Sequence, residues 1–278
     1  MPVEQPSWLP DLYAIIRARY DGAAVPADDR DALLSKIIGG FGEPTDDHGV
    51  CWSAGNWARG LMSASSAEAR NLAALVEQLS SELPDGCAGH PEWHLITRSD
   101  VFARNDDPLR LFLATMAWGY GNRGLGWPRV RDIASADSFA ARIDRFVKSV
   151  ASVPPDAPAA AWTAVADNAG RPHKVHMAFG SKLAYFAAYD RTRQRGPLIA
   201  DIWAAWGFWT FWGSDDRWER SALWDIRTDC GLYVQYVAEA ETWAAEHGHR
   251  SDDIERALFT AGPHAKRCWD KLHEIKIS

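Results

Sequence analysis

The sequence predicts a mainly α-helical protein. Apolar residues recur at the spacing of a helix face in most segments, and the alternating patterns of half-buried strands are scarce. N-cap residues, glycines and prolines stand at the ends of these segments, where they start and stop helices. Hydrophobic residues make up 47% of the chain and charged residues 24%, a balance typical of a globular, soluble protein.

Helix signals are clear in the first half of the chain. Ser65 and Glu68 fit a capping box ahead of one apolar stripe. Asp107 and Pro108 suit the N-cap and first turn of another helix, and a third N-cap is expected near Asp137. Helices are therefore predicted over 12–20, 33–38, 68–83, 107–121 and 139–150, and loops over 51–60, 85–93 and 122–127.

The stretch ASVPPDAP, at 151–158, is the most linker-like segment. It separates residues 1–150 from 159–278, which would give two helical subdomains, although one continuous packed unit is left open. Beyond it, apolar spacing predicts helices over 177–189, 199–209, 228–246, 252–260 and 264–274.

The net charge of −7 argues against a surface that binds polyanions everywhere, but not against a local basic face. Such a local excess lies between Arg171 and Arg195, where six Lys and Arg residues accompany a single acidic residue, Asp190. If the protein binds phosphate groups, we therefore expect the contacts to lie in this segment.

The four cysteines, Cys51, Cys87, Cys230 and Cys268, form no C-x-x-C pair, so no zinc-ribbon or iron–sulfur spacing is present. No signal peptide is recognised, and we expect free thiols in a reducing cytoplasm. The apolar run at 202–213 is too short to span a bilayer, so we expect a buried element and no membrane association.

A lysine within this basic segment and a carboxylate shortly after it both stand in apolar surroundings. Lys182 follows Gly180 by two residues, and Asp201 comes nineteen residues after Lys182. A charge in such a setting is costly unless it is paired or used in chemistry. Burial near positive charge disfavours the ammonium form of a lysine, as a nucleophilic amine requires. Asp201 could take its proton or stabilise a developing positive charge on a sugar.

The residues around the lysine suit contact with a phosphate. A tight turn at Phe179 and Gly180 would offer backbone N–H groups and a helix N-terminus to an anion. Lys174, His176 and Ser181 flank this turn and are the other residues expected to contact phosphate groups. His173 and His176 have no third ligand nearby, so we expect no metal and no cofactor.

The motif FGSK, which contains Lys182, followed by Asp201 within PLIADIW resembles the helix-hairpin-helix DNA glycosylases, and among them the 8-oxoguanine DNA glycosylase branch. That family has a G-x-G-[TS]-K turn followed further along by V-[PD]-x-D. Ala178 replaces the first glycine of the turn, and Trp203 stands where the family often has histidine. The four-cysteine cluster of the iron–sulfur members is absent. The match covers residues 170–210.

The resemblance implies a helix-hairpin-helix element and an active-site cleft between two helical subdomains, into which a base is flipped. It implies that Lys182 attacks C1′ of the deoxyribose, expels the base and forms a Schiff base, with possible β-elimination that nicks the strand. Asp201 would activate the amine and stabilise the oxocarbenium-like transition state. The segment LATMAWGYGNRGLGWPRVRDIA resembles the family's duplex-inserting part, which implies an inserting loop near 119–127. Asn122 and Arg123 would fill the gap in the duplex or contact the orphaned base.

The chain has fifteen tryptophans, most of which are expected in the core. Trp203, Trp206, Tyr236 and Trp243 could form the aromatic walls of a base pocket, where stacking contributes roughly 1–3 kcal/mol per base. Two substrates are left open, an oxidised purine or a bulky modified base of the kind that phages use. The second substrate would make the protein an anti-phage defence enzyme.

Two other functions are also open. The hairpin could belong to a non-catalytic DNA- or nucleotide-sensing module, with Lys182 at the surface and Asp201 only an N-cap. The chain could instead be an all-α protein-interaction domain that uses exposed tryptophans. As a glycosylase, it would act as a monomer on double-stranded DNA carrying a damaged or modified base, in the cytoplasm and at the nucleoid.

Overall fold

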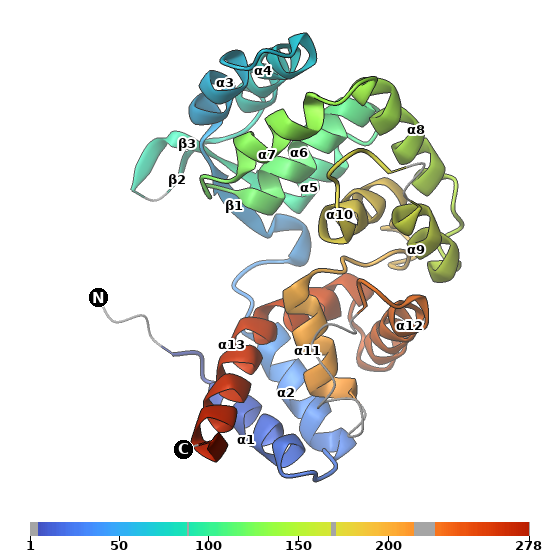
Figure 1. The fold of residues 1–278 in the computed structure, drawn as a ribbon. Coiled ribbons are helices and arrows are strands. Elements are labelled where there is room, and N and C mark those ends of the chain that lie inside the picture. The colour runs from blue at the N-terminus through green and yellow to red at the C-terminus, as the bar shows by residue number, and fades with distance from the viewer. Residues whose placement is uncertain (1–4, 88, 168–170, 214–225, 278) are drawn as a thin grey trace. The chain divides into compact units, whose positions relative to one another are not determined.

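A computed structural model describes residues 5–87, 89–167, 171–213 and 226–277. These ranges are mostly helical with one small sheet, which confirms the predicted all-α class (Figure 1). Contacts divide the chain into two compact units. Unit 1 is Met1–Gly42 together with Ile199–Ser278, and unit 2 is Glu43–Leu198.

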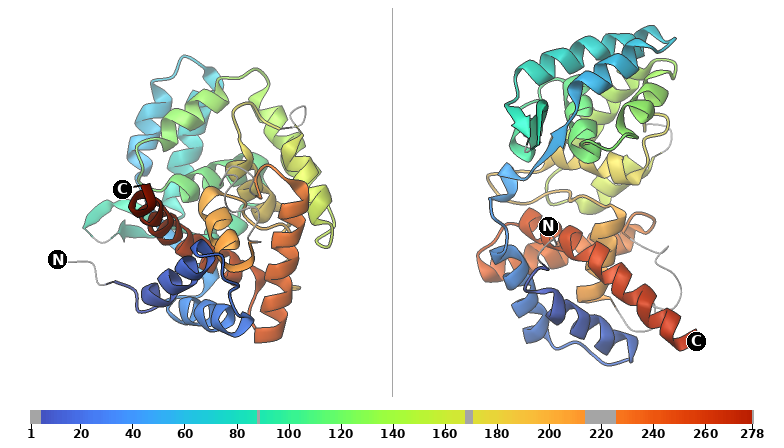
Figure 2. Two further views of the ribbon diagram at one scale, coloured as in Figure 1. Left: turned by 60° about the horizontal axis from the view of Figure 1, so that its bottom comes forward. Right: turned by 90° about the vertical axis from the view of Figure 1, so that its left-hand side faces the viewer.

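Unit 1 is built around one long helix, α13. Its helices are α1 (Leu9–Tyr20), α2 (Ala27–Gly39), α11 (Ile202–Trp212), α12 (Cys230–His247) and α13 (Ser251–Ile277). α13 contacts the other four, and two further views show it running past α1 and α2 (Figure 2). The core contains fully buried apolar side chains such as Leu12, Leu34 and Leu258.

Unit 2 packs its helices around α6 and α10. They are α3 (Ala54–Met62), α4 (Ala67–Ser81), α5 (Arg98–Phe102), α6 (Pro108–Tyr120), α7 (Gly126–Ala134), α8 (Phe139–Ala151), α9 (Pro158–Ala166) and α10 (Met177–Ala188), with a 3-10 turn at Thr45–Asp47. α6 is buried from Leu111 to Trp118 and contacts α10. As predicted, Asp107 caps α6, because its Oδ1 accepts the N–H groups of Leu109 and Arg110 at 2.9 and 3.1 Å.

A three-stranded antiparallel sheet lies in unit 2, where the sequence predicted loops. Its strands are β1 (Gly49–Trp52), β2 (Asp85–Cys87) and β3 (His90–Thr97), in the order β1-β3-β2. A disulfide joins Cys51 to Cys87, so the prediction of free thiols is wrong for this pair, while Cys230 and Cys268 are outside any disulfide.

The prediction of a loop at 51–60 failed for β1 because its pairing with β3 is not local, whereas at 85–93 the missed pairing is that of β2 with β3, two consecutive strands. β3 reads HPEWHLIT and has no clean alternation, and its burial pattern is equally irregular. It becomes a strand by pairing with β1, in register from Gly49–Thr97 to Trp52–His94, more than forty residues apart in sequence. The remainder of 51–60 forms most of α3.

Several helix ends differ from the prediction. The N-cap of α4 is Ser66, whose side chain accepts the Ala69 N–H, so the capping box at Ser65 is wrong. α8 begins after Ser138, which adopts a left-handed conformation. α13 is one helix although Pro263 lies inside it, because packing on its neighbours offsets the lost backbone hydrogen bond.

The linker-like stretch at 151–158 lies inside unit 2. α8 and α9, on either side of it, both contact α10 and each other. The two compact units therefore do not follow the division of 1–150 from 159–278, because the packing of α10 joins the segments on both sides of the stretch.

The apolar run at 202–213 forms α11, which is buried over most of its length, as the sequence predicted. In the part of the chain that the structure describes, no helix has the length and apolar character needed to cross a membrane.

Candidate active site

Lys182 lies in the second turn of α10. The N–H groups of Phe179 and Gly180 donate to the carbonyl of His176, the N-cap, at 3.0 and 2.8 Å. Phe179 and Gly180 therefore lie inside the helix, and the tight turn predicted at these residues is wrong. α10 packs against α9, the helix that precedes it in the chain.

Gly180 has a packing role that explains its presence inside a helix. A Cβ at this position would lie 2.6 Å from Cγ1 of Val165 on α9. Only glycine lets the two helices approach this closely, because real Cβ atoms do not make contacts of that length. The adjacent Ser181 is buried and its hydroxyl donates to the Ala178 carbonyl at 3.3 Å.

The Lys182 side chain is only 6% exposed. Its Nζ donates to the Ala178 carbonyl at 3.4 Å and lies 5.5 Å from the centre of the Phe179 ring. Its Cδ faces α6, where a Cβ on Gly119 would lie 3.4 Å away. An amine held by a carbonyl and an aromatic face has a restricted position, which suits a group that must meet one carbon atom of a substrate.

The other predicted phosphate contacts lie at the surface before α10. Lys174 has a positive φ of 62° and lies 3.7 Å from the carboxylate of Asp132. His176 is exposed and its side chain makes no capping hydrogen bond. Both are accessible to an anion that approaches the N-terminus of α10, and their contact with DNA stays a prediction.

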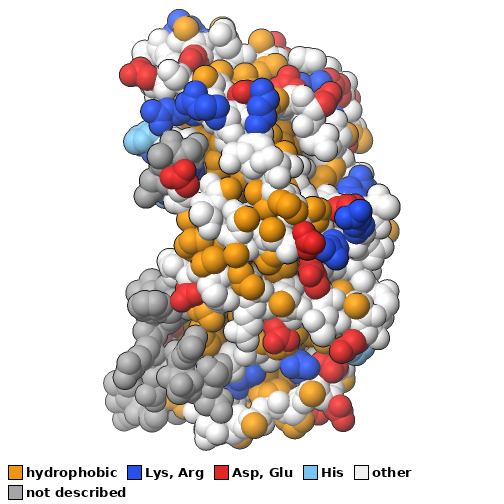
Figure 3. Space-filling model, turned by 90° about the vertical axis from the view of Figure 1, so that its right-hand side faces the viewer, with side chains coloured by type: hydrophobic (Ala, Val, Ile, Leu, Met, Phe, Trp, Pro, Cys, Tyr) orange, Lys and Arg blue, Asp and Glu red, His pale blue; other side chains and the backbone are white. Residues whose placement is uncertain are grey.

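The basic residues after α10 are paired with carboxylates of unit 2. The pairs are Arg191 with Asp46 at 2.6 Å, Arg193 with Asp190 at 3.6 Å and Arg195 with Asp156 at 3.3 Å. Exposed pairs of this kind contribute about 0–1 kcal/mol each, so a phosphate could replace the carboxylates. On the face drawn in Figure 3, Lys and Arg side chains lie in separate groups beside acidic ones.

Asp201 is the N-cap of α11 in unit 1. Its Oδ1 accepts the N–H groups of Trp203 and Ala204 at 2.9 and 3.0 Å, and the residue is 7% exposed. The segment just before it is anchored by Tyr236, whose hydroxyl donates to the Ile199 carbonyl at 3.1 Å. A single carboxylate oxygen thus makes both capping bonds.

Two glycines hold α11 directly against α13. A Cβ on Gly207 would lie 2.2 Å from the Leu258 carbonyl oxygen, and a Cβ on Gly262 would lie 2.1 Å from the Trp203 carbonyl oxygen. The C-terminus of α11 is fixed by Arg19, which donates to the carbonyls of Thr210, Phe211 and Gly213. The helix that begins at Asp201 is therefore held at both ends.

The four aromatic residues predicted to wall a base pocket all belong to unit 1. Tyr236 is fully buried, and Trp243 is 3% exposed with its Nε1 donating to Asp31 at 2.9 Å. Trp206 is 8% exposed and the Lys266 ammonium lies 5.9 Å from its ring. Trp203 is half-buried, whereas the other three residues of the set are buried.

The loop that carries Asn122 and Arg123 borders a pocket in unit 2. The pocket has a volume of about 360 Å³. It is lined by Ser53, Asn56, Trp57, Arg59, Gly60, Gly121, Asn122, Arg123, Gly124 and Trp127. Indole walls beside amide and guanidinium groups match what a nucleobase next to a phosphate offers, namely a flat ring, hydrogen-bonding edges and negative charge.

Leu125, at the end of this loop, was missed by the sequence reasoning. It is 71% exposed, the largest exposure among the large apolar side chains of the described residues. Exposed apolar side chains of this size are the ones that proteins insert between base steps. The signal was present in the sequence, since this leucine stands between two glycines in an otherwise polar loop.

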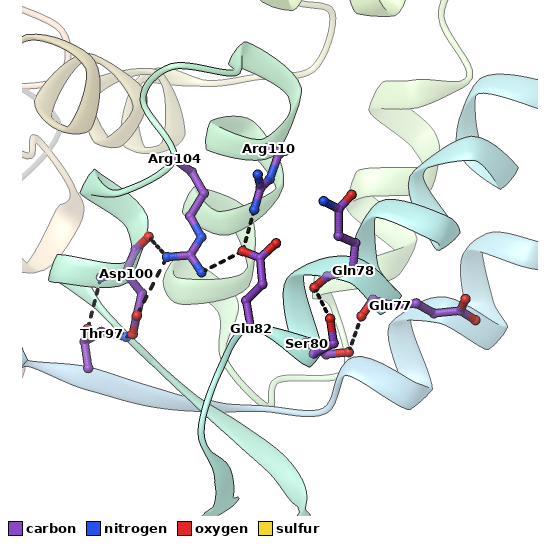
Figure 4. Close-up of polar contacts among 9 residues, drawn as sticks. Glu77, Gln78, Ser80, Glu82, Thr97, Asp100, Arg104 and Arg110 are labelled. Atoms are coloured by element: carbon purple, nitrogen blue, oxygen red, sulfur yellow. Dashed lines mark hydrogen bonds and ion pairs between the residues drawn. The ribbon is translucent and has the colours of Figure 1, made fainter.

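Polar contacts fix the helices behind the loop. Glu82, at the end of α4, faces Arg104 and Arg110, and Arg104 also donates to the Asp100 carbonyl at 2.5 Å (Figure 4). These contacts tie α4 to α5 and α6. The fully buried Arg98 lies over the rings of Trp118 and Tyr185, which connects α5 to α6 and α10.

Burial changes the pKa of two side chains on α13. Burial lowers the pKa of His264, and the neighbouring Arg267 lowers it further. Burial raises the pKa of the Cys268 thiol, which Lys271 partly opposes. Among the described residues, no group of three or more His, Cys, Asp or Glu side chains is arranged to hold a metal ion.

A family model described as "Putative 8-oxoguanine DNA glycosylase OGG-like protein" matches residues 43–259. No curated protein and no solved structure matches the chain. The matched range contains Lys182, Asp201 and the loop with Leu125.

Proposed function

This chain belongs to the 8-oxoguanine DNA glycosylase OGG-like family, and on that premise we propose that it releases a damaged or modified base from double-stranded DNA through a lysine nucleophile. The observation that carries the proposal is Lys182, a buried amine in the second turn of α10 within the matched range. A buried lysine without a catalytic or binding role would be costly to keep.

In the proposed reaction, the lone pair of Lys182 Nζ attacks C1′ of the extruded nucleotide. The N-glycosidic bond breaks, its electron pair leaves with the base, and the base takes up a proton. The nitrogen passes one proton to Asp201. The C1′–O4′ bond then breaks, O4′ takes up that proton as a hydroxyl, and a protonated imine joins Nζ to C1′. Loss of a proton from C2′ would then expel the 3′ phosphate and nick the strand.

Flipping is needed because C1′ is inaccessible inside the duplex. We propose that the loop 121–125 enters the duplex as the nucleotide leaves. Leu125 would be the wedge between base steps, and Asn122 and Arg123 would fill the gap or contact the orphaned base at the pocket that they line.

The substrate is an oxidised purine or a hypermodified base, and the second would give the enzyme a role in anti-phage defence. The half-buried Trp203 is the aromatic side chain that suits stacking on either base. In the repair role, the protein would act as a monomer at the nucleoid in base excision.

The test measures bases released from duplexes that carry single modified bases, by mass spectrometry, together with borohydride trapping of the imine. We expect Lys182→Gln to abolish release and trapping while DNA binding is retained. Lys148→Gln is the matched control, because Lys148 lies exposed on α8 and pairs with Asp144. Release by Lys182→Gln at the wild-type rate would refute the proposed nucleophile.

The loop has a separate test. Leu125→Ala should slow release from a fully paired duplex more than from a single strand, because only the duplex must be opened. Equal loss on both substrates would exclude the wedge.

The alternative is a DNA-binding module of this fold without catalysis. It would bind DNA with a strong dependence on salt and release no base from any modified duplex. A protein-interaction domain based on exposed tryptophans has less support. Among the described residues, the exposed large apolar side chains are Tyr13, Met62, Leu95 and Leu125, none of them a tryptophan.

A further inference from the structure

The C-terminal turn of α6 lies against the side chains of Phe179 and Lys182. A Cβ on Gly119 would lie 2.6 Å from Cε1 of Phe179 and 3.4 Å from Cδ of Lys182. The missing side chain at Gly119 therefore makes the space that the Phe179 ring and the lysine stem occupy. Gly119 is inside a helix, where glycine is otherwise unfavourable by about 1 kcal/mol, so a packing reason is expected.

Phe179 is held between this glycine and an aromatic neighbour. Its ring stacks on Tyr120 with centroids 4.5 Å apart and planes 21° apart. Phe179 precedes Lys182 by three residues, so the two side chains share one face of α10. The ring in turn lies 5.5 Å from Lys182 Nζ, within reach of a cation–π attraction.

The same turn of α6 leads straight into the loop 121–125. At Gly121 the chain turns with a φ of 53°, and a Cβ there would lie 3.2 Å from the Cys51 carbonyl oxygen. The turn is thus pressed against β1, and Tyr120 is the last helical residue before it. Tyr120 is therefore adjacent in the chain to the loop and in ring contact with Phe179.

We infer that Phe179, fixed between Gly119 and Tyr120, is a positioning residue that sets the place of the Lys182 amine, and that Tyr120 links this place to the loop 121–125. The inference rests on the proposed function. It assigns Phe179 a role inside unit 2 in addition to the DNA contact expected of it. A reacting amine misplaced by about 1 Å can lose roughly 100-fold in rate, so such a contact has a measurable effect.

The first experiment compares Gly119→Ala and Phe179→Leu with wild type in single-turnover base release and DNA binding. We expect the rate to fall roughly 10- to 100-fold in both variants, while the dissociation constant of Gly119→Ala, which changes no expected DNA contact, changes by less than about twofold. Tyr120→Phe keeps the stacked ring and should retain the wild-type rate, whereas Tyr120→Leu should not. Gly39→Ala is the matched control, because a Cβ at Gly39 meets nothing within 4 Å.

A double mutant tests the contact itself. Leucine lacks the ring atoms that an alanine at position 119 would meet, so Gly119→Ala should cost less in the Phe179→Leu background than in wild type. Additive losses in rate would refute a direct contact between the two positions.

The second measurement does not depend on activity. Labelling of the Lys182 amine by an amine-specific reagent, followed by mass spectrometry of its peptide, reports how well the side chain is held. We expect Gly119→Ala and Phe179→Leu to label Lys182 roughly fivefold faster than wild type, with unchanged thermal unfolding midpoints. Unchanged labelling would overturn the inference. Faster labelling together with full base release by Lys182→Gln would instead reject the proposed nucleophile and leave the positioning contact supported.

Discussion

Asp201 has a structural role and a proposed chemical role, and two substitutions separate them. Oδ1 accepts the N–H groups of Trp203 and Ala204, so Asp201→Ala leaves two backbone donors without this acceptor at a buried helix end. Loss of an N-cap costs about 0.5–2 kcal/mol, and with little water nearby we expect the upper half of that range. Asparagine keeps a side-chain oxygen and caps about as well as aspartate, so Asp201→Asn should stay within about 0.5 kcal/mol of wild type.

The assay combines urea unfolding, followed by tryptophan fluorescence, with single-turnover base release. We expect Asp201→Asn to keep the unfolding midpoint while the rate of release falls by roughly 10²- to 10⁴-fold, because the amide cannot take a proton. Asp201→Ala should lose both stability and rate. A wild-type rate in Asp201→Asn would refute the chemical role and leave only the cap, and a fully stable Asp201→Ala would refute the cap.

Three further predictions concern stability. Gly207→Ala would bring a Cβ within 2.2 Å of the Leu258 carbonyl oxygen. Because a backbone atom cannot rotate aside as the end of a side chain can, we expect the free energy of unfolding in urea to fall by about 3 kcal/mol. A decrease of less than about 1 kcal/mol would contradict the close approach of the two helices. The Cys51–Cys87 disulfide spans 36 residues, so Cys51→Ser should lower stability by about 4 kcal/mol on the chain-entropy scale, and an unfolding midpoint insensitive to reductant would disprove the bond. Burial lowers the pKa of His264 from 6.5, so as the pH falls the unfolded chain takes up a proton at this histidine before the folded chain does, and the free energy of unfolding decreases below about pH 6.5. His264→Gln should remove this part of the pH dependence of stability, which is less than about 1 kcal/mol at a partly exposed site. A titration midpoint of His264 at or above 6.5 by NMR would refute the lowered pKa.

Local signals in the sequence were enough for the fold class and for the position of most helices. Asp107 and Pro108 marked the start of α6 correctly, because an N-cap and a first-turn proline act on the adjacent backbone only. The spacing of FGSK and Asp201 likewise indicated the family that the comparison supports. Both kinds of signal lie within a few turns of chain and need no knowledge of distant contacts.

The β1–β3 pairing and the disulfide depended on residues far apart in the sequence. β3 has no clean alternation and pairs with β1 across more than forty residues. Cys51 and Cys87 lie on different strands of the small sheet, and nothing in their spacing marks them as partners. The two glycines beside Leu125 mark a loop in the sequence, but only the structure shows that its side chain is 71% exposed.

The sequence by itself determined a helical chain with an amine and a carboxylate in apolar segments, because periodicity and capping are properties of short stretches. Only the tertiary structure decided what the glycines do. Gly119 makes room for Phe179 and Lys182, Gly180 admits α9, and Gly207 brings α11 onto α13. The physical reason is that a glycine chosen for close approach has the same local appearance as one chosen for a turn, and the atom that a side chain would meet belongs to another part of the chain.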